Sequence, residues 1–443
     1  MAAEARTEGS KTFIDRVEDL LWPLTIVLVL IAPSQFSYAL DPKDGPFILY
    51  ADLFAAALFG LWALVVLVGR RWRKITYPPA AIWALLAVAA ISALGATSLS
   101  SAVVEIAQLG LYFVAVYALF ANVIRGQHRL VLIAKIVAIG TTVAIGVAIY
   151  QYFTVDDPMD VRGTFGNRNV YSAYLVMVLP LLYGMAIWMR DTTHRTWFLG
   201  VVVLGALTML AGLQFWCLML VLGVLSALKS LRWLGYFVLG AAIIVTLFVG
   251  VLHTNRDAVF AEVTDPIERG ETFKLGPGHE AERVVKMRWL EWHPALVMTA
   301  ENFPTGVGVG NYQRHIGESS YWGMVPRATK IEPDTNNLYL VIAASMGFVG
   351  LVALLAWLGH HWRLAEANWI EAKDAWSMGV CWGLLGSVYG IVLVNIFSSL
   401  FVRGTSLVWA LIFAMIASVS IHGFGGRDVS SIENASEHRS RED

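Results

Sequence analysis

The sequence predicts an all-α protein that crosses a membrane many times. Of its 443 residues, 57% are hydrophobic and only 15% are charged, which is outside the range of soluble domains. Apolar runs repeatedly reach the length that a helix needs to span the hydrocarbon core of a bilayer. The connections between them alternate in charge, as loops on opposite sides of a membrane do. The formal net charge of −1 gives no overall field that would attract nucleic acid.

The apolar runs predict about twelve membrane spans. They lie at about residues 20–40, 47–68, 80–97, 102–124, 130–152, 170–190, 197–212, 214–228, 231–252, 338–359, 376–401 and 404–422. The seventh and eighth runs are short and nearly joined, so eleven or thirteen spans also fit the pattern. The first run is too long for the core of a signal peptide and is read as a retained helix.

Lysine and arginine concentrate in alternate connections. The basic connections are residues 70–74, 125–129, 190–195, 229–232 and 360–374, whereas 41–46, 98–101 and the turn at Gln214 are not basic. The positive-inside rule makes the basic set cytoplasmic, with both termini on the same side. The chain then divides into a bundle of about nine helices (1–252), an external loop region with an amphipathic helix (253–337), C-terminal transmembrane helices (338–422) and a disordered cytoplasmic tail (423–443).

Three helices that would begin at the outer surface have polar starts. The sixth opens within VRGTFGNRNVYSAY, the tenth opens within PDTNNLYL, and the twelfth begins near Arg403. The polar residues of the first two are Arg162, Asn167, Arg168, Asn169, Asp334, Thr335, Asn336 and Asn337. Ordinary helix capping explains any one Asn, Asp or Thr. Arginines beside helix N-termini together suit a phosphate or diphosphate at the outer boundary, and without a soluble nucleotide fold it would belong to a lipid carrier.

The external segment contains a helix-period stretch with one unusual cation. Val284, Trp292 and Ala295 share a face, and Arg288 projects from that same face. A cation there either meets an anion or reaches solvent. Glu291, three residues further along, is close enough to form a structural ion pair with it.

Other patterns do not predict a site. Gly306, Gly308 and Gly310 in GVGVG lack the spacing and the strand–helix setting of a phosphate loop, so a tight turn is the better interpretation. The ten histidines are scattered without metal-binding spacing, and we expect no metal or cofactor. Glu105 lies near the outer end of its span, where it can reach water.

Three stretches resemble successive signatures of the O-antigen ligase and polymerase superfamily. They are RGTFGNRNVYSAYL, then MRWLEWHPALVM…FPTGVGVGNYQ, then DTNNLYLVIAASMGFVGL, over roughly residues 160–355. The resemblance implies a GT-C-like membrane fold in the bacterial inner membrane, with the large loop periplasmic. It also implies inverting transfer of a glycan from an undecaprenyl diphosphate carrier to an acceptor: the lipid A core, a carrier-linked glycan or a protein. Arg162 and Arg288 match family arginines expected to hold the diphosphate, with membrane lipids as the surroundings and no metal required.

The chain departs from the family pattern at two positions. Gln214 lies nearest the place where many members carry an arginine, and Asn336–Asn337 replaces a His–Asn pair whose histidine is proposed to activate the acceptor. A neutral Asn is not a base, so the chain uses another group, positions the acceptor without a base, or has lost activity. Asp334 and Glu332 are the nearest carboxylates, and capping or solvation explains Glu332. The alternative functions are an inactive or accessory glycolipid-binding protein, or a polysaccharide transporter, on the same scaffold.

Overall fold

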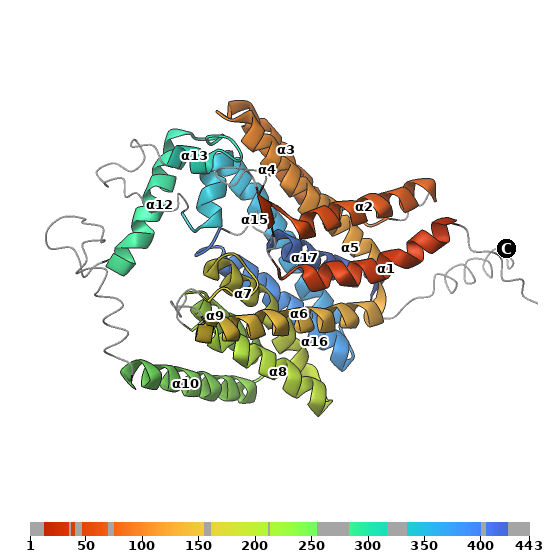
Figure 1. The fold of residues 1–443 in the computed structure, drawn as a ribbon, viewed down its shortest axis with the longest axis vertical. Coiled ribbons are helices and arrows are strands. Elements are labelled where there is room, and N and C mark those ends of the chain that lie inside the picture. The colour runs from red at the N-terminus through yellow and green to blue at the C-terminus, as the bar shows by residue number, and fades with distance from the viewer. Residues whose placement is uncertain are drawn as a thin grey trace, which may run out of the picture.

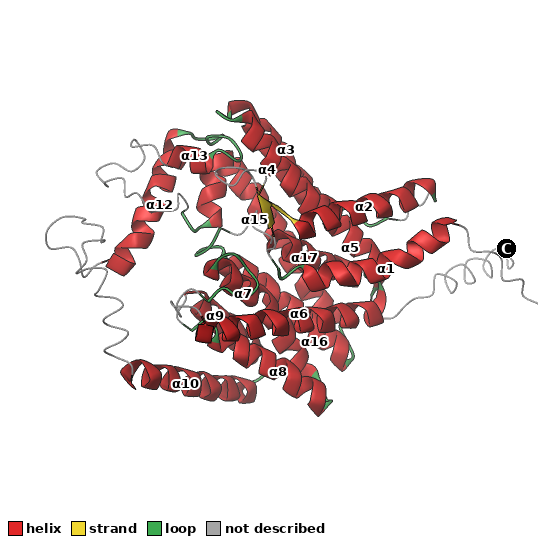
Figure 2. Ribbon diagram, viewed as in Figure 1, coloured by secondary structure: helices red, strands yellow, loops and turns green. Residues whose placement is uncertain are grey.

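The computed structural model is α-helical apart from one short hairpin of two strands in the part of the chain that it describes (Figure 1). Figure 2 shows the same view coloured by secondary structure, with this hairpin in yellow among the helices. The structure describes residues 13–34, 37–39, 47–69, 75–154, 161–210, 213–254, 283–316, 335–399 and 405–423.

The helices follow one another with short connections over most of the chain. They are α1 (Phe13–Ile31), α2 (Tyr50–Val68), α3 (Ala80–Ser92), η2 (Ala93–Gly95), α4 (Leu99–Gly110), η3 (Leu111–Val116), α5 (Tyr117–Val123), α6 (Gly126–Thr154), α7 (Arg168–Trp188), α8 (Thr192–Leu207), α9 (Leu213–Lys229), α10 (Leu231–Thr254), α12 (Arg283–Glu301), α13 (Tyr312–Ile316), α15 (Leu338–Glu371), α16 (Ala375–Val394) and α17 (Thr405–His422). Strands β1 (Ser37–Ala39) and β2 (Phe47–Leu49) pair antiparallel.

Most of these helices have the character of membrane spans. Seven described stretches are long and apolar enough to cross a bilayer: Tyr50–Val68, Leu99–Val123, Gly126–Thr154, Arg168–Trp188, Leu338–Glu371, Ala375–Val394 and Thr405–His422. Shorter apolar helices lie at Ala80–Gly95, Gln214–Lys229 and Leu231–Ile243. Each predicted span overlaps a helix. The helical membrane class is therefore confirmed, whereas twelve crossings and a GT-C-like arrangement stay predictions.

Helices α7 and α16 pack closely against each other at the centre of the bundle. A Cβ atom added to Gly184 would lie 2.4 Å from the backbone nitrogen of Gly383. One added to Gly390 would lie 2.3 Å from the carbonyl oxygen of Val176. Both distances are shorter than a Cβ tolerates, so only glycine fits. Small residues at such contacts let the backbones of membrane helices approach one another.

Contacts bring several of the basic connections together at one end of the bundle. The side chain of Gln127, after α5, donates a hydrogen bond of 2.9 Å to Asp374, before α16. The guanidinium of Arg195, at the start of α8, lies 5.2 Å from the ring centroid of Trp233 in α10. We call this the basic end: the connections around residues 125, 191, 230 and 373. Which side of the membrane it faces stays a prediction.

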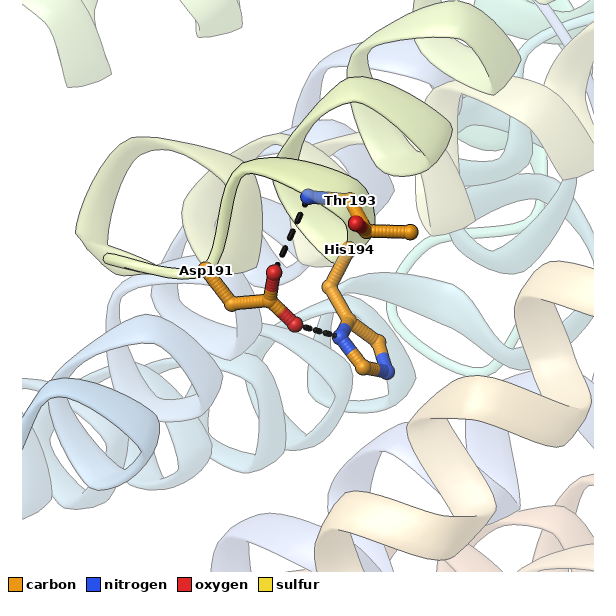
Figure 3. Close-up of polar contacts among 3 residues, drawn as sticks. All are labelled: Asp191, Thr193 and His194. Atoms are coloured by element: carbon orange, nitrogen blue, oxygen red, sulfur yellow. Dashed lines mark hydrogen bonds and ion pairs between the residues drawn. The ribbon is translucent and has the colours of Figure 1, made fainter.

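A helix cap at the basic end uses a carboxylate and a histidine. Asp191 accepts a hydrogen bond of 3.0 Å from the backbone N–H of Thr193, and its other oxygen contacts Nδ1 of His194 (Figure 3). The bond with His194, and then that with Thr193, lower the pKa of Asp191 below its usual value. The His194 ring also meets the edge of Trp376, with centroids 5.8 Å apart. This pair therefore caps α8 and joins it to α16.

Two of the predicted span boundaries are wrong for local reasons. The first helix occupies 13–31 rather than 20–40, because Pro33 cannot extend it and the chain turns into the hairpin, which the sequence did not predict. The eleventh span ends at Val394 rather than 401, because the chain turns at Asn395, where Ile396 and Phe397 donate back to Leu393 and Val394.

The tenth predicted span is also wrong, because the helix is longer than predicted and is interrupted. Helix α15 continues to Glu371, so most of the predicted connection 360–374 is helical. Its last turns are held by packing: Asn368 donates 2.8 Å to the carbonyl of Ile416, and Trp369 packs on Trp382. The helix is also broken at Gly347, which has φ 70° and ψ −175°.

The loop after α12 fills the break in α15. Val307 N–H donates 2.9 Å to the carbonyl of Ala344, and Gly308 N–H donates 2.9 Å to that of Ser345. These carbonyls lose their helical donors at the break, so the loop satisfies them. The three glycines of GVGVG all have positive φ, from 71° to 100°. The predicted tight turn is therefore confirmed, and it fixes the loop after α12 onto α15.

Candidate functional site

The start of α15 is a capped helix N-terminus with little exposed surface. The side chain of Asn337 accepts a hydrogen bond of 3.1 Å from the N–H of Leu340. Asn336 adopts the left-handed conformation, with φ 47°, which Asn tolerates better than most residues. Thr335 is fully buried. The capping interpretation of Asn337 is thus confirmed.

The segment after α16 contacts both the start of α15 and the start of α9. The N–H of Leu338 donates 2.9 Å to the carbonyl of Asn395, just after α16. The amide of Gln214, in the first turn of α9, donates 3.2 Å to the hydroxyl of Ser398. We call the five buried polar residues here the polar junction: Gln214, Thr335, Asn337, Asn395 and Ser398. Gln214 and Asn337, both proposed from the sequence, therefore lie in one region.

The polar junction has unused hydrogen-bonding capacity. Among the described residues, the hydroxyl of Thr335 and the amide oxygen of Asn395 are buried and have no hydrogen-bond partner. Each such group costs about 1–3 kcal/mol. Buried polar groups of this kind are uncommon in folded proteins and call for an explanation.

A second polar helix start lies at α7. Gln151 of α6 accepts hydrogen bonds from the N–H groups of Arg162 and Gly163, at 3.0 and 2.8 Å, and donates 2.8 Å to the carbonyl of Gly163. The side chain of Arg162 is exposed and makes one weak contact, of 3.5 Å, to the carbonyl of Gly166. Gln151 thus fixes the backbone of this loop and leaves the guanidinium at the surface.

Asn167 and Asn169 take part in the cap of α7. The side chain of Asn167 accepts 2.7 Å from the backbone N–H of Asn169. The hydroxyl of Tyr171, in the first turn, bonds at 2.8 Å to that of Thr208 at the end of α8. Since α9 and Gln214 follow α8 within a few residues, the α7 start lies at the same end of the bundle as the polar junction.

Helix α12 packs against the first part of α15 through its C-terminal half. Ala295 and Met298 are fully buried in a small cluster with Val307 and Ala344 of the loop and α15. Figure 1 shows α12 beside the first part of α15, at the edge of the bundle. The predicted inward face is confirmed at Ala295. Arg288 lies two turns earlier on this helix, with its side chain, like those of Val284 and Glu291, outside the described residues.

Residues 195–355 match a family model described as O-antigen ligase. This part of the chain is therefore similar to the O-antigen ligase family. The resemblance noted in the sequence to the O-antigen ligase and polymerase superfamily is confirmed, and with it the membrane setting. The chain has no significant match among curated proteins.

The range that matches the O-antigen ligase model contains some of the predicted site residues and not others. Gln214, Arg288, Asp334, Asn336 and Asn337 fall inside the matched range, and Arg162, Asn167, Asn169 and Arg403 fall outside it. Asp334 and Arg403 lie outside the described residues. Within the described ranges no three His, Cys, Asp or Glu side chains gather as a metal site. The predicted roles of these residues stay predictions.

Sequence reasoning missed two members of the polar junction. Asn395 and Ser398 were assigned to the interior of the eleventh span. Their signal was present in VNIFSS, a cluster of polar residues at the end of an otherwise apolar run. Polar residues inside a membrane span usually face the protein interior or a cavity, so they were reasonable candidates.

Proposed function

We propose that this chain is an inverting membrane glycosyltransferase of the O-antigen ligase or polymerase type. It would move a glycan from an undecaprenyl diphosphate carrier to an acceptor at the outer face of the bacterial inner membrane. The observation that carries the proposal is the similarity to the O-antigen ligase family over residues 195–355, which includes the start of α15 and Gln214. The polar junction supports it, since neutral, buried hydrogen-bonding groups suit the hydroxyls of a sugar better than an ion.

The proposed reaction is a single displacement at the sugar carbon that bears the diphosphate. An acceptor hydroxyl attacks this carbon, the bond to the diphosphate oxygen breaks, and the carrier diphosphate leaves with the electron pair. Arg162 and Arg288 would stabilise the charge that develops on the leaving group, because guanidinium groups bind phosphate oxygens in pairs. Removing one such electrostatic contact typically lowers the rate about 10²–10³-fold.

The start of α15 would receive the acceptor. Asn336 and Asn337 would orient it through their amides, and Asp334 is the proposed group that takes the hydroxyl proton. The N–H groups at the starts of α7 and α15 add positive potential at the same end of the bundle. Gln214 replaces the charge of an arginine with a neutral donor, so more of the diphosphate binding would fall to Arg162, Arg288 and Arg403.

The experiment is glycan transfer by the purified full chain in lipid vesicles. An undecaprenyl diphosphate-linked oligosaccharide is the donor, and lipid A core and a second carrier-linked glycan are offered as separate acceptors. We expect transfer to one acceptor with release of undecaprenyl diphosphate. Donor binding without release in the presence of either acceptor would instead support the accessory glycolipid-binding function.

Arg288→Lys is the most direct test of the diphosphate role. Lysine keeps the charge but loses the planar pair of donors, so transfer should fall about 10²-fold while insertion and folding stay normal. Glu291→Gln is the matched control, because an exposed helix ion pair contributes only a few tenths of a kcal/mol. Equal and slight effects of the two substitutions would remove Arg288 from the site.

A further inference from the structure

Two connections at the basic end contain more cations than the helix cap there uses. They are residues 188–197, between α7 and α8, and residues 227–236, between α9 and α10, and the structure describes every residue of both. Asp191 and His194 form the cap of α8, and theirs is the only ion pair among the described residues of these connections. We call the other charged side chains of the two connections the basic cluster: Arg190, Arg195, Lys229 and Arg232.

Two contacts between a cation and an aromatic ring bring the two connections together. Nζ of Lys229 lies over the ring of Trp188 at the end of α7. The guanidinium carbon of Arg195 lies 5.2 Å from the ring centroid of Trp233 in the first turn of α10. The first contact joins α9 to α7, and the second joins α8 to α10. Figure 1 shows α8, α9 and α10 beside one another at the edge of the bundle, so the basic cluster occupies one region of the surface.

The charged groups of the basic cluster can reach an anion. Arg190 and Arg232 are exposed, and Arg195 and Lys229 are half-buried. A contact with the face of a tryptophan ring orients a cation without using its N–H donors in a hydrogen bond. Arg195 therefore keeps its planar set of donors, which suits the oxygens of a phosphate.

The neighbouring start of α16 does not supply a counter-ion to the cluster. It reaches the cluster through Trp376, whose ring meets the edge of His194. The carboxylate of Asp374 there accepts hydrogen bonds from two backbone N–H groups and from Gln127. A further cation, Lys135 of α6, lies 4.9 Å from the ring centroid of Trp376. The charge in this region therefore favours a ligand that is negative.

The surface beside the basic cluster is apolar. Leu228, Leu231 and Tyr236 are 55%, 83% and 58% exposed, as expected for side chains that contact lipid. Tryptophans of membrane helices concentrate at the level of the lipid headgroups, and Trp188 and Trp233 lie within the cluster. A negative ligand that also has acyl chains matches both surfaces. Clusters of lysine and arginine beside membrane helices attract lipids of this kind.

We infer that the basic cluster binds the phosphodiester of an anionic phospholipid of the phosphatidylglycerol type. Arg195 and Arg232 donate hydrogen bonds to its oxygens, Lys229 adds positive charge, and the acyl chains lie along α10. Since Arg195 belongs to α8 and Arg232 to α10, the lipid bridges these two helices. The inference depends only on the chain being a membrane protein and is independent of the proposed glycan transfer.

The test is lipid binding to the purified full chain in neutral detergent, measured by native mass spectrometry. Phosphatidylglycerol, phosphatidylcholine and inorganic phosphate are titrated separately, and we expect phosphatidylglycerol to bind most tightly. Arg232→Gln should weaken this binding about fivefold, which corresponds to about 1 kcal/mol for one cation at a membrane surface. Arg363→Gln is the matched control, because Arg363 is an equally exposed arginine of α15, which packs on α3, α12, α16 and α17.

A second variant distinguishes lipid binding from a structural role of the Arg195–Trp233 contact. Arg195→Gln, added to Arg232→Gln, should weaken phosphatidylglycerol binding by a further factor of about five. A contact that is only structural would lower the melting temperature and leave the lipid preference unchanged. If this double variant does not fold, the comparison of Arg232→Gln with Arg363→Gln decides alone, since both side chains are exposed.

Three results would overturn the inference. The first is equal binding of phosphatidylglycerol and phosphatidylcholine to the unmodified chain. The second is an equal effect of Arg232→Gln and Arg363→Gln. The third is displacement of phosphatidylglycerol by inorganic phosphate at the same concentration, which would indicate a site for phosphate alone.

Discussion

At the basic end, charged side chains join helix ends through contacts near the protein surface, as Gln127 does with Asp374 and Asp191 with His194. At the polar junction the side chains are neutral and buried, and the hydroxyl of Thr335 and the amide oxygen of Asn395 have no partner among the described residues. Unsatisfied buried atoms also occur at the basic end, where Nε1 of Trp188 and Nε2 of His422 have none. The two ends therefore differ in chemical character: ionisable groups cap helices at the basic end, whereas neutral hydroxyl and amide groups meet at the polar junction. Unsatisfied groups lower stability, and such a cost is commonly retained where a protein binds or reacts.

The largest expected effect is all-or-none labelling of the two ends. Single cysteines at positions 270, 280 and 320 should react with a membrane-impermeant reagent added from outside, and cysteines at 127 and 373 should not. Position 365, a natural choice from the sequence, is unsuitable because Ala365 is buried within α15. Labelling of both groups from the same side would remove the orientation on which the proposed outer site depends.

A smaller but still large effect is expected near Asn336, the position where many members of the resembled family have a histidine. If Asp334 is the base, Asp334→Asn should lower glycan transfer about 10²–10⁴-fold and leave binding of the carrier nearly intact. Transfer and carrier binding are measured separately in vesicles. Asn336→Ala is the companion variant. Transfer that survives both substitutions would mean that no base acts at this position, and the family mechanism would not apply here.

The break in α15 offers a matched pair of glycines on one helix. A Cβ added at Gly347 would lie 1.7 Å from the carbonyl oxygen of Pro304, and its φ of 70° disfavours any other residue. Gly347→Ala should therefore lower stability by about 2–4 kcal/mol and disturb the start of α15. Gly359 has no neighbour within 4 Å of an added Cβ, so Gly359→Ala should be neutral or stabilising. Melting temperatures in detergent compare the two, and equal losses would show that the break is not required.

The smallest expected effect is at the cap of α16. Asp374 accepts from the N–H groups of Trp376 and Ser377 at 3.0 and 3.1 Å. Desolvation raises its pKa, but the bonds from Ser377 and Trp376 outweigh it, so the pKa lies below its usual value. Asp374→Ala should cost about 1 kcal/mol near neutral pH.

The pH dependence of that cost follows from the direction of the shift. A carboxylate whose pKa is lower in the folded state stabilises the fold above its unfolded pKa, near 4, and loses this contribution as pH falls through the folded value. The difference between Asp374→Ala and the unmodified chain should therefore shrink below about pH 4. Gln127→Ala removes a donor to the same carboxylate but leaves the cap, so its smaller cost should shrink over the same pH range. A constant Asp374 difference across acid pH would contradict the ionised cap.

Local rules of the sequence predicted much of the fold and part of the candidate site. Apolar run length identified the membrane helices, since burial in lipid imposes it on each segment separately. The caps at Asn167 and Asn337 were foreseeable because the capping residue and its donors lie within a few positions of each other. The inward face at Ala295 followed from the helical period in the same way.

Other features of the fold were decided by the tertiary structure alone, because they depend on contacts between segments that are far apart in the chain. The break in α15 requires Pro304 against Gly347, and no pattern within the apolar run predicts it. The polar junction exists because α9 and α15 both contact the segment at the end of α16. The place of Asn395 and Ser398 in it could not be predicted from the residues next to them in the sequence. Sequence alone determined which segments are long and apolar enough to enter a membrane, because these properties belong to each segment separately. Which polar groups face one another was decided by packing, because packing joins residues that are far apart in the chain.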